Sequence, residues 1–346
     1  MSISIEGVVS LNMSSKKFKV VITECPSIRG EPDFEREALG RVGAEVILLR
    51  TRDESIILEA TRDADVVLCD AAQITEKIIS NFEKLRGIVE YGIGYDNIDV
   101  DAAIAEGIYV CNIPDYCISE VADHALSLIL SLTRKIPWIN QLTKEGRWEE
   151  IKRDFDDFRP IPNLQSLTAG VIGFGKIGRN VVKRLRSFGL KVLVYDPYVP
   201  ESQIRLGGGE STDLEDLLTK SDVVTLHTPL TNETYHMVGE KEMNLMKRTA
   251  MLINTSRGPV VDQKALYKAL KEGRIALAGL DVLEEEPPRH DDRLLKLPNV
   301  LVTPHIAYFS ERSDRVIREY AVEEVIRILE GRRPKNLVNP EVLSSQ

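Results

Sequence analysis

Three ionisable side chains stand at the ends of predicted strands in the second half of the sequence. Arg257 follows the apolar run 251–254, Glu286 comes shortly after a second run, and His305 follows a third. A guanidinium can bind a carboxylate through two parallel hydrogen bonds, and an imidazole can give or take a proton near neutral pH. Because open parallel sheets bind ligands at the carboxyl ends of their strands, we expect the three side chains to converge there. Taken singly, each could equally be a surface or loop charge.

The segment Gly173-Phe174-Gly175-Lys176-Ile177-Gly178 has the spacing of a dinucleotide-binding turn. It follows the apolar run 168–172 and precedes an amphipathic helical pattern. The first glycine permits a tight turn, the second lets the backbone approach a pyrophosphate, and the third allows close packing of helix on strand. Asp196 ends the next predicted strand, 18 residues after Gly178, near the spacing of the carboxylate that binds the ribose 2′-hydroxyl. We therefore predict NAD, rather than NADP, as the cofactor.

The five histidines differ in their surroundings. His305 is the candidate for catalysis. His227 follows a predicted strand, where its backbone could line the cofactor. His124 lies in a predicted helix and is expected to be packed or on the surface, while His236 and His290 fall in polar, loop-like segments.

Apolar runs of strand length alternate with helical patterns, which predicts parallel sheets covered on both faces. The first set of predicted strands is 19–23, 45–49, 65–69, 87–91 and 108–112, followed by a long helix at 119–135. The second set has six strands, 168–172, 191–195, 223–226, 251–254, 276–281 and 300–303, with a last helix at 310–330. The predicted fold class is α/β, with two doubly wound parallel-sheet domains of Rossmann or flavodoxin type.

The order of these elements predicts a discontinuous first domain. The helix at 310–330 leaves the second sheet and can carry the chain back to the first. We expect a substrate domain made of residues 1–117 and 313–346, with an NAD-binding domain, residues 118–312, inserted between two linking helices. The active site would lie in the cleft between these domains. Residues 1–15 receive no role.

The composition excludes several other classes of protein. The chain has 346 residues, 43% hydrophobic and 29% charged, which suits two globular domains. A net charge of −9 argues against a nucleic-acid partner, and no apolar run approaches the about 20 residues of a membrane span. We find no secretory signal and no zinc-like cysteine spacing, so we expect a cytoplasmic protein without a metal and with four reduced, mostly buried cysteines. Spacing alone would permit a Cys111–Cys117 pair.

Taken together, the motifs resemble those of the D-isomer-specific 2-hydroxyacid dehydrogenases over residues 16–339. Arg257 and Glu286 are 29 residues apart and His305 lies 19 further on, as the family pattern requires. The other segments that carry the resemblance are the dinucleotide turn, Asn254-Thr255-Ser256-Arg257-Gly258, Asp281, Glu286-Pro287, Pro304-His305 and Gly92-Ile93-Gly94-Tyr95-Asp96-Asn97.

The resemblance implies an oxidoreductase that transfers hydride reversibly between NADH and a small 2-keto acid. His305 would act as general acid, or as base in the oxidative direction, Glu286 would stabilise its imidazolium form, and Arg257 would bind the substrate carboxylate. Backbone N–H groups of the Gly92, Ile93 and Gly94 loop would bind the same carboxylate. The expected cofactor contacts are Val121, Gly173, Phe174, Gly175, Lys176, Ile177, Gly178, Asp196, His227, Thr228, Pro229, Thr255, Ser256, Arg257, Asp281, at the nicotinamide carboxamide, and His305.

Within the family, the chain looks most like the branch of the C-terminal-binding-protein corepressors. The likeness rests on segments 115–123, 195–198 and 305–311. The corepressors carry a Trp where this chain has Tyr308 and an Arg where it has Glu90. If Glu90 approaches the substrate, it would disfavour a second anionic group, and Tyr308 would favour a small neutral or modestly apolar tail. Glu90 could instead point away and pair with a neighbouring Lys or Arg.

Two alternatives compete with a simple dehydrogenase. A regulatory protein that senses NAD(H), with little turnover, is compatible with the corepressor resemblance. A formate dehydrogenase is disfavoured because that group carries a Gln at the position of Glu286. The resemblance also implies a homodimer, formed through the first linking helix and the segment 138–162.

Overall fold

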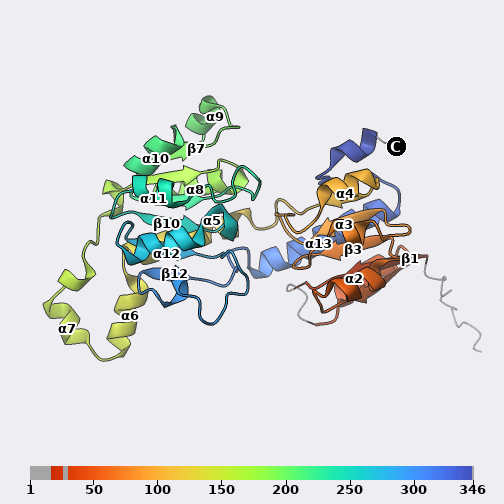
Figure 1. The fold of residues 1–346 in the computed structure, drawn as a ribbon, viewed down its shortest axis with the longest axis horizontal. Helices are drawn as coiled ribbons and strands as arrows, with labels where there is room; N and C mark the ends of the chain where they lie inside the picture. Colours follow the sequence, from red (N-terminus) through yellow and green to blue (C-terminus); the bar gives the residue numbers. More distant parts are fainter. Residues whose placement is uncertain (1–16, 26–29, 345–346) are drawn as a thin grey trace, which may run out of the picture. The chain divides into compact units, whose positions relative to one another are not determined.

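The computed structural model describes residues 17–25 and 30–344, and the chain divides into two compact units (Figure 1). Unit 1 consists of residues 1–116 and 314–346, and unit 2 of residues 117–313. Each division lies one residue from a predicted domain boundary. The substrate and cofactor roles given to the two domains remain predictions, and segment 1–15 lies outside the described residues.

Unit 1 contains a five-stranded parallel sheet in the order β2-β1-β3-β4-β5. Its strands are β1 (Phe18–Ile22), β2 (Ala44–Leu48), β3 (Val66–Cys69), β4 (Gly87–Glu90) and β5 (Tyr109–Cys111). The helices are α1 (Asp33–Gly40), α2 (Glu54–Thr61), α3 (Glu76–Ile79), α4 (Val100–Ala105) and most of α13 (Glu311–Leu329), which begins in unit 2. The strands β3 and β4 are buried along their whole length, as expected for a parallel sheet covered on both faces.

Unit 2 contains a seven-stranded parallel sheet in the order β12-β11-β10-β9-β6-β7-β8. The strands are β6 (Thr168–Ile172), β7 (Lys191–Tyr195), β8 (Glu210–Ser211), β9 (Val223–Leu226), β10 (Met251–Asn254), β11 (Leu277–Leu280) and β12 (Val300–Val302). The prediction of six strands is wrong by one, because β8 consists of two exposed polar residues and gives no apolar pattern. The order reverses at β6, between β9 and β7, which is the switch point where such sheets bind nucleotides.

Helices cover both faces of this sheet. Apolar residues of α5 (Ile118–Thr133) and α8 (Lys176–Ser187) share one buried cluster with β6 and β7. A second cluster joins the sheet to α10 (Leu214–Lys220), α11 (Glu240–Leu245) and α12 (Gln263–Lys271). The short helix α9 (Glu201–Leu206) lies between β7 and β8 in the chain. The two-domain α/β prediction is therefore confirmed.

Two further helices of unit 2, α6 (Ile136–Lys144) and α7 (Trp148–Arg153), extend away from its sheet (Figure 1). Neither has a buried residue, and Ile136, Trp148 and Phe155 are each more than half exposed. We call residues 136–162 the arm. The arm therefore carries three large apolar side chains that are exposed to solvent.

All four cysteines are buried and none is in a disulfide, so the prediction of reduced, mostly buried cysteines is confirmed and no disulfide joins Cys111 to Cys117. Among the helices of the described ranges, none is both long enough and apolar enough to cross a bilayer.

Candidate active site

The glycine-rich turn joins β6 to the start of α8. Gly173 has φ of +92°, and a Cβ there would lie 2.6 Å from the carbonyl oxygen of His227. A Cβ on Gly178 would lie 2.1 Å from the carbonyl oxygen of Gly173, so both positions require glycine. A Cβ on Gly175 would meet nothing within 4 Å. The protein itself therefore does not demand glycine at the second position, which is consistent with a close approach by a ligand.

Asp196 follows β7 and braces the same turn. One carboxylate oxygen accepts a hydrogen bond from the backbone N–H of Phe174 (2.7 Å), and the other accepts one from Tyr198 (2.9 Å). The carboxylate thus lies at the glycine turn, where the prediction requires it.

Buried polar atoms without partners gather at the ends of β9 and β10. Among the described residues, His227 Nδ1, Thr228 Oγ1 and Thr255 Oγ1 have no hydrogen-bond partner. Burial lowers the pKa of His227 to about 3, and its Nε2 lies 2.9 Å from Thr225 Oγ1. His227 is therefore neutral under ordinary conditions. Unsatisfied buried groups are costly, and a polar ligand at these strand ends would satisfy them.

These features fit a dinucleotide. The open side of Gly175, the twelve-residue helix α8 behind it and the Asp196 carboxylate would take the pyrophosphate and the ribose. The unpartnered hydroxyls at the neighbouring strand ends would take further polar groups of the cofactor.

His305 and Glu286 form the closest ionisable pair at the strand ends. His305 Nδ1 lies 2.6 Å from Glu286 Oε2, and both side chains are partly exposed. Burial alone would raise the pKa of Glu286, but the hydrogen bond and charge of His305 outweigh it, and the pKa is lowered. Glu286 is therefore an ionised carboxylate in direct contact with His305. Its effect on the imidazole stays a prediction.

The loop that carries His305 is held by Asp281. His305 has φ of +50°, a left-handed conformation that costs a residue with a side chain about 1 to 3 kcal/mol. Its backbone N–H donates to the carbonyl oxygen of Asp281 (2.7 Å), and the buried Asp281 carboxylate accepts from the backbone N–H groups of Ile306 (3.0 Å) and Ala307 (2.8 Å). Asp281 thus shapes the loop that carries His305. Its contact with the nicotinamide remains a prediction.

A second hydrogen-bond chain reaches Asp281 from helix α5. The Thr303 hydroxyl donates to Asp281 Oδ1 (2.6 Å), and His124 Nε2 lies 2.9 Å from the same hydroxyl. His124 is partly buried, within the range that the sequence led us to expect. Its link to the loop of His305 was not foreseen, since the two residues are far apart in the sequence.

Arg257 reaches the same region from the end of β10. The Asn254 side chain donates to the Arg257 carbonyl oxygen (2.8 Å), which fixes the turn. A Cβ on Gly258 would lie 1.8 Å from the carbonyl oxygen of Leu283, so glycine lets this turn lie against the segment that carries Glu286. The charge of Arg257 also contributes to the lowered pKa of Glu286, after the larger effects of burial and of His305.

In unit 1, the Gly92 loop has two backbone donors without an acceptor among the described residues. The carbonyl oxygen of Gly92 accepts from Ile113 N–H (2.8 Å), and that of Ile93 accepts from the Asn112 side chain (2.6 Å). Among the described residues, the N–H groups of Ile93 and Gly94 have no acceptor. A loop whose carbonyls are occupied and whose N–H groups are available suits an anion. Asn112 is a supporting residue that the sequence analysis missed.

Glu90 is buried and belongs to the support of this loop. Its Oε2 accepts from the Asn97 side chain (3.0 Å) and lies 3.1 Å from Cys69 Sγ, and a Cβ on Gly92 would lie 3.2 Å from its Oε1. Burial raises the pKa of the Cys69 thiol, and the nearby Glu90 charge adds to this effect, so the thiol is the donor. Two of its partners are therefore an amide and a thiol. Both interpretations of Glu90 stay predictions.

The remaining predicted residues lie in unit 2. Val121 is buried in the first turn of α5, and Ser256 donates to the Asn254 side chain (2.8 Å). Tyr308 is partly buried and its ring meets that of Phe309 edge-on, with centroids 6.4 Å apart. All the predicted catalytic and cofactor-binding residues therefore share one unit.

Comparisons with known proteins agree with this arrangement. The model of the family described as "D-isomer specific 2-hydroxyacid dehydrogenase, NAD binding domain" matches residues 126–307. A glyoxylate reductase of Korarchaeum cryptofilum is 43% identical over 295 residues, covering 84% of this chain and 87% of the relative. A D-3-phosphoglycerate dehydrogenase of Methanocaldococcus jannaschii is 41% identical over 305 residues, covering 88% of this chain but only 56% of that longer protein.

Solved structures show the same likeness. The D-lactate dehydrogenase of Aquifex aeolicus, complexed with NAD and lactic acid, has a TM-score of 0.83 and 34% sequence identity, and the match covers 92% of this chain and 98% of that one.

The chain is thus an NAD-binding oxidoreductase of 2-hydroxy acids, and it belongs to the D-isomer-specific 2-hydroxyacid dehydrogenase family. NAD is its cofactor. The predictions of family, enzyme class and cofactor are confirmed, whereas the place within the corepressor branch stays a prediction.

Proposed function

We propose that the enzyme reduces a small 2-keto acid with a neutral side chain, with His305 as general acid, Glu286 as its supporting carboxylate and Arg257 as the carboxylate-binding cation. The observation that carries this proposal is the 2.6 Å contact between His305 Nδ1 and Glu286 Oε2. Because this contact occupies Nδ1, the other ring nitrogen, Nε2, can face a substrate.

The reduction needs one proton at the carbonyl oxygen. When bound, the reduced nicotinamide supplies the hydride to the carbonyl carbon. His305 then donates its Nε2 proton to the oxygen as negative charge develops there, and Glu286 keeps the imidazole protonated until that moment. In the reverse direction the neutral imidazole accepts the hydroxyl proton.

The substrate carboxylate needs cations or N–H donors in fixed positions. Arg257 can bind it through two parallel hydrogen bonds, a geometry that a lysine cannot reproduce. The N–H groups of Ile93 and Gly94 have no acceptor among the described residues and would supply further donors. Both features support a carboxylate group as the part that all substrates share.

The substrate side chain is proposed to be small and uncharged. Two relatives named glyoxylate reductase, from Korarchaeum cryptofilum and Thermococcus litoralis, share 43% and 42% identity with this chain, which supports glyoxylate. Glu90 lies behind Gly92 as a buried acid and offers no cation for a second anionic group. Hydroxypyruvate and 2-ketobutyrate are the next candidates, with the Tyr308 ring against the tail.

A substrate series tests this function. NADH oxidation is measured with glyoxylate, hydroxypyruvate, 2-ketobutyrate, 2-ketoglutarate and phosphohydroxypyruvate. The proposal expects kcat/KM for at least one of the first three to exceed that for the last two by more than about tenfold, a difference of about 1.4 kcal/mol in transition-state stabilisation. Preference for the dicarboxylate or the phosphorylated acid would refute the proposed substrate class, and no oxidation with any acid would refute the activity.

A further inference from the structure

The turn 283–286 decides where Glu286 points. Glu286 closes the turn itself, because its Oε1 accepts from the Leu283 N–H (2.8 Å) while its Oε2 meets His305. Any contact that fixes this turn therefore also fixes the partner of the catalytic imidazole.

Glu284 ties the turn to the rest of unit 2. Its Oε1 accepts from the backbone N–H of Gln263 (2.9 Å), and its own N–H donates to the Gln263 side-chain oxygen (3.0 Å). The same Oε1 lies 2.8 Å from His236 Nε2. Glu284 is thus held by the start of α12 on one side and by an imidazole on the other.

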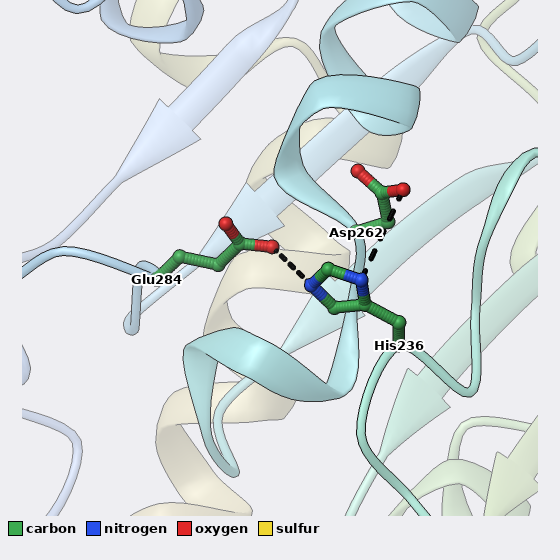
Figure 2. Close-up of side chains that lie close together, drawn as sticks. All are labelled: His236, Asp262 and Glu284. Carbon is green, nitrogen blue, oxygen red and sulfur yellow. Dashed lines mark hydrogen bonds and ion pairs between the residues drawn. The ribbon is translucent and has the colours of Figure 1, made fainter.

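His236 lies between two carboxylates, as Figure 2 shows. Its Nε2 faces Glu284, and its Nδ1 faces Asp262 at 4.0 Å. Asp262 is the N-cap of α12, where Oδ1 accepts from Ala265 N–H (2.9 Å), and the Tyr235 ring stacks on the imidazole with centroids 4.1 Å apart. Within the described residues, these two acids are the charged groups that face His236.

The imidazole of His236 connects the two carboxylates. The three side chains lie close enough to share an ion. Figure 2 shows the imidazole between the carboxylates, with a different nitrogen toward each. The ring thus links the two carboxylates through a direct contact with Glu284 at 2.8 Å and a longer one with Asp262 at 4.0 Å.

The backbone of His236 is also fixed. Its N–H donates to the carbonyl oxygen of Pro259 (2.8 Å), and Val238 N–H donates to that of Val260 (3.1 Å). The residue has φ of +51°, the left-handed conformation. The segment that follows β9 is therefore anchored to the stretch between Arg257 and α12, and His236 extends this anchor to the turn of Glu286.

We propose that His236 is a positioning residue: by bridging Asp262 and Glu284 it holds the turn 283–286 so that Glu286 remains on His305. This inference rests on the proposed roles of Glu286 and His305. The chain of contacts runs from Asp262 through His236 and Glu284 to the turn, and His236 itself touches neither the catalytic imidazole nor the substrate.

The test uses His236→Asn, because asparagine tolerates a left-handed backbone but is too short to bridge the two carboxylates. His290→Asn, in an exposed loop, is the matched control. We expect His236→Asn to lower kcat about 3-fold to 10-fold, to leave the Kd for NADH unchanged and to move the pH profile of kcat/KM for reduction to lower pH. Glu284→Gln, which keeps an acceptor for Gln263 but loses the charge, should act in the same direction and more weakly.

Combination with Glu286→Gln separates positioning from general damage. If His236 acts through Glu286, His236→Asn adds nothing to the pH profile in the Glu286→Gln background. Additive shifts, or a His236→Asn profile identical to that of the wild type, would overturn the proposal.

A second readout does not depend on turnover. The titration of the His305 imidazole is followed by NMR without substrate, and the His305→Ala variant assigns its resonance among five histidines. We expect the midpoint to move to lower pH in His236→Asn and not in His290→Asn. An unmoved midpoint contradicts the positioning role even if the enzyme is active, whereas a wild type inactive on every 2-keto acid contradicts only the proposed function.

Discussion

One carboxylate, that of Glu286, contacts the imidazole of His305. Glu286 is 2.6 Å away, and its pKa is lowered because the hydrogen bond and charge of His305 outweigh the effect of burial. A lowered carboxyl pKa means that Glu286 stays ionised throughout the range in which an imidazole titrates. The negative charge beside His305 is therefore constant over that range.

Removal of that charge should move the pH dependence of the reaction. In Glu286→Gln the imidazolium loses its partner, so His305 gives up its proton at lower pH, and we expect the falling limb of kcat/KM for keto-acid reduction to shift down by about one pH unit. The measurement is a pH series of NADH oxidation. Glu285→Gln, a substitution of the adjacent exposed acid, is the control and should leave the limb in place. If the falling limb of the pH profile does not move in Glu286→Gln, a group other than the His305–Glu286 pair determines the pH dependence.

His227 should make the fold sensitive to acid. Burial lowers its pKa from 6.5 to about 3, so the unfolded chain binds a proton that the folded protein rejects below pH 6.5. The unfolded state then holds more protons, and stability falls as pH decreases from 6.5 toward 3, by about 2 kcal/mol between pH 7 and 5 from this residue. Urea unfolding at both pH values should show a smaller loss for His227→Gln than for wild type or His290→Gln. Equal losses would contradict a buried neutral imidazole.

At the scale of elements, the turn after β7 should select the cofactor. Asp196 lies at the glycine turn, bonded to Phe174 and Tyr198 N–H groups, where a 2′-phosphate would meet its negative charge. A repulsion of about 2 to 3 kcal/mol gives a preference for NADH over NADPH of about 30-fold to 150-fold.

The substitution Asp196→Ser should reduce this preference mainly by improving kcat/KM with NADPH. Glu201→Ser, at the start of α9, is the control for a general loss of negative charge. It should keep the wild-type ratio of kcat/KM with NADH to kcat/KM with NADPH. Equal use of NADH and NADPH by the wild type would show that Asp196 does not face the ribose.

Strands were the elements that the sequence predicted best. β6, β7, β9 and β10 begin and end at the predicted residues, because buried parallel strands are continuous apolar runs bounded by polar turns. Most ends of the other predicted strands differ from the observed ends by one residue, which is within the usual uncertainty of strand bounds. β8 was missed because two exposed polar residues carry no such pattern.

The part of the candidate site that lies within sequence motifs could be predicted from the sequence. The residue types and spacing of Arg257, Glu286 and His305 predicted a shared site, and the structure places the last two in contact. The residues that hold these side chains in place could not be predicted, because their roles depend on tertiary contacts. The Asp281 carboxylate accepts a hydrogen bond from the loop of His305, and the Asn112 side chain donates to the carbonyl oxygen of Ile93, 19 residues away in the sequence. His236 was assigned only to a polar loop, since nothing local points to Glu284.

At the scale of the whole molecule, the exposed apolar side chains of the arm, residues 136–162, suggest how the chain assembles. Ile136, Trp148 and Phe155 are more than half exposed, and a second copy of the chain would bury them. We therefore predict a homodimer of about twice 38.9 kDa that Trp148→Asp weakens toward the monomer. Light scattering after gel filtration measures the mass, with Leu206→Asp, an exposed position on α9, as the control. A monomeric wild type, or a Trp148→Asp variant as dimeric as wild type, would contradict this interface.

The central claim is that His305 delivers the proton when NADH reduces a small 2-keto acid. The most direct measurement is a single turnover of enzyme-bound NADH with the best 2-keto acid, for wild type and His305→Ala, with NADH affinity determined separately by fluorescence. The account predicts a loss of about 10² to 10⁴ in rate with NADH affinity retained. A His305→Ala variant that oxidises NADH at the wild-type rate would contradict the account.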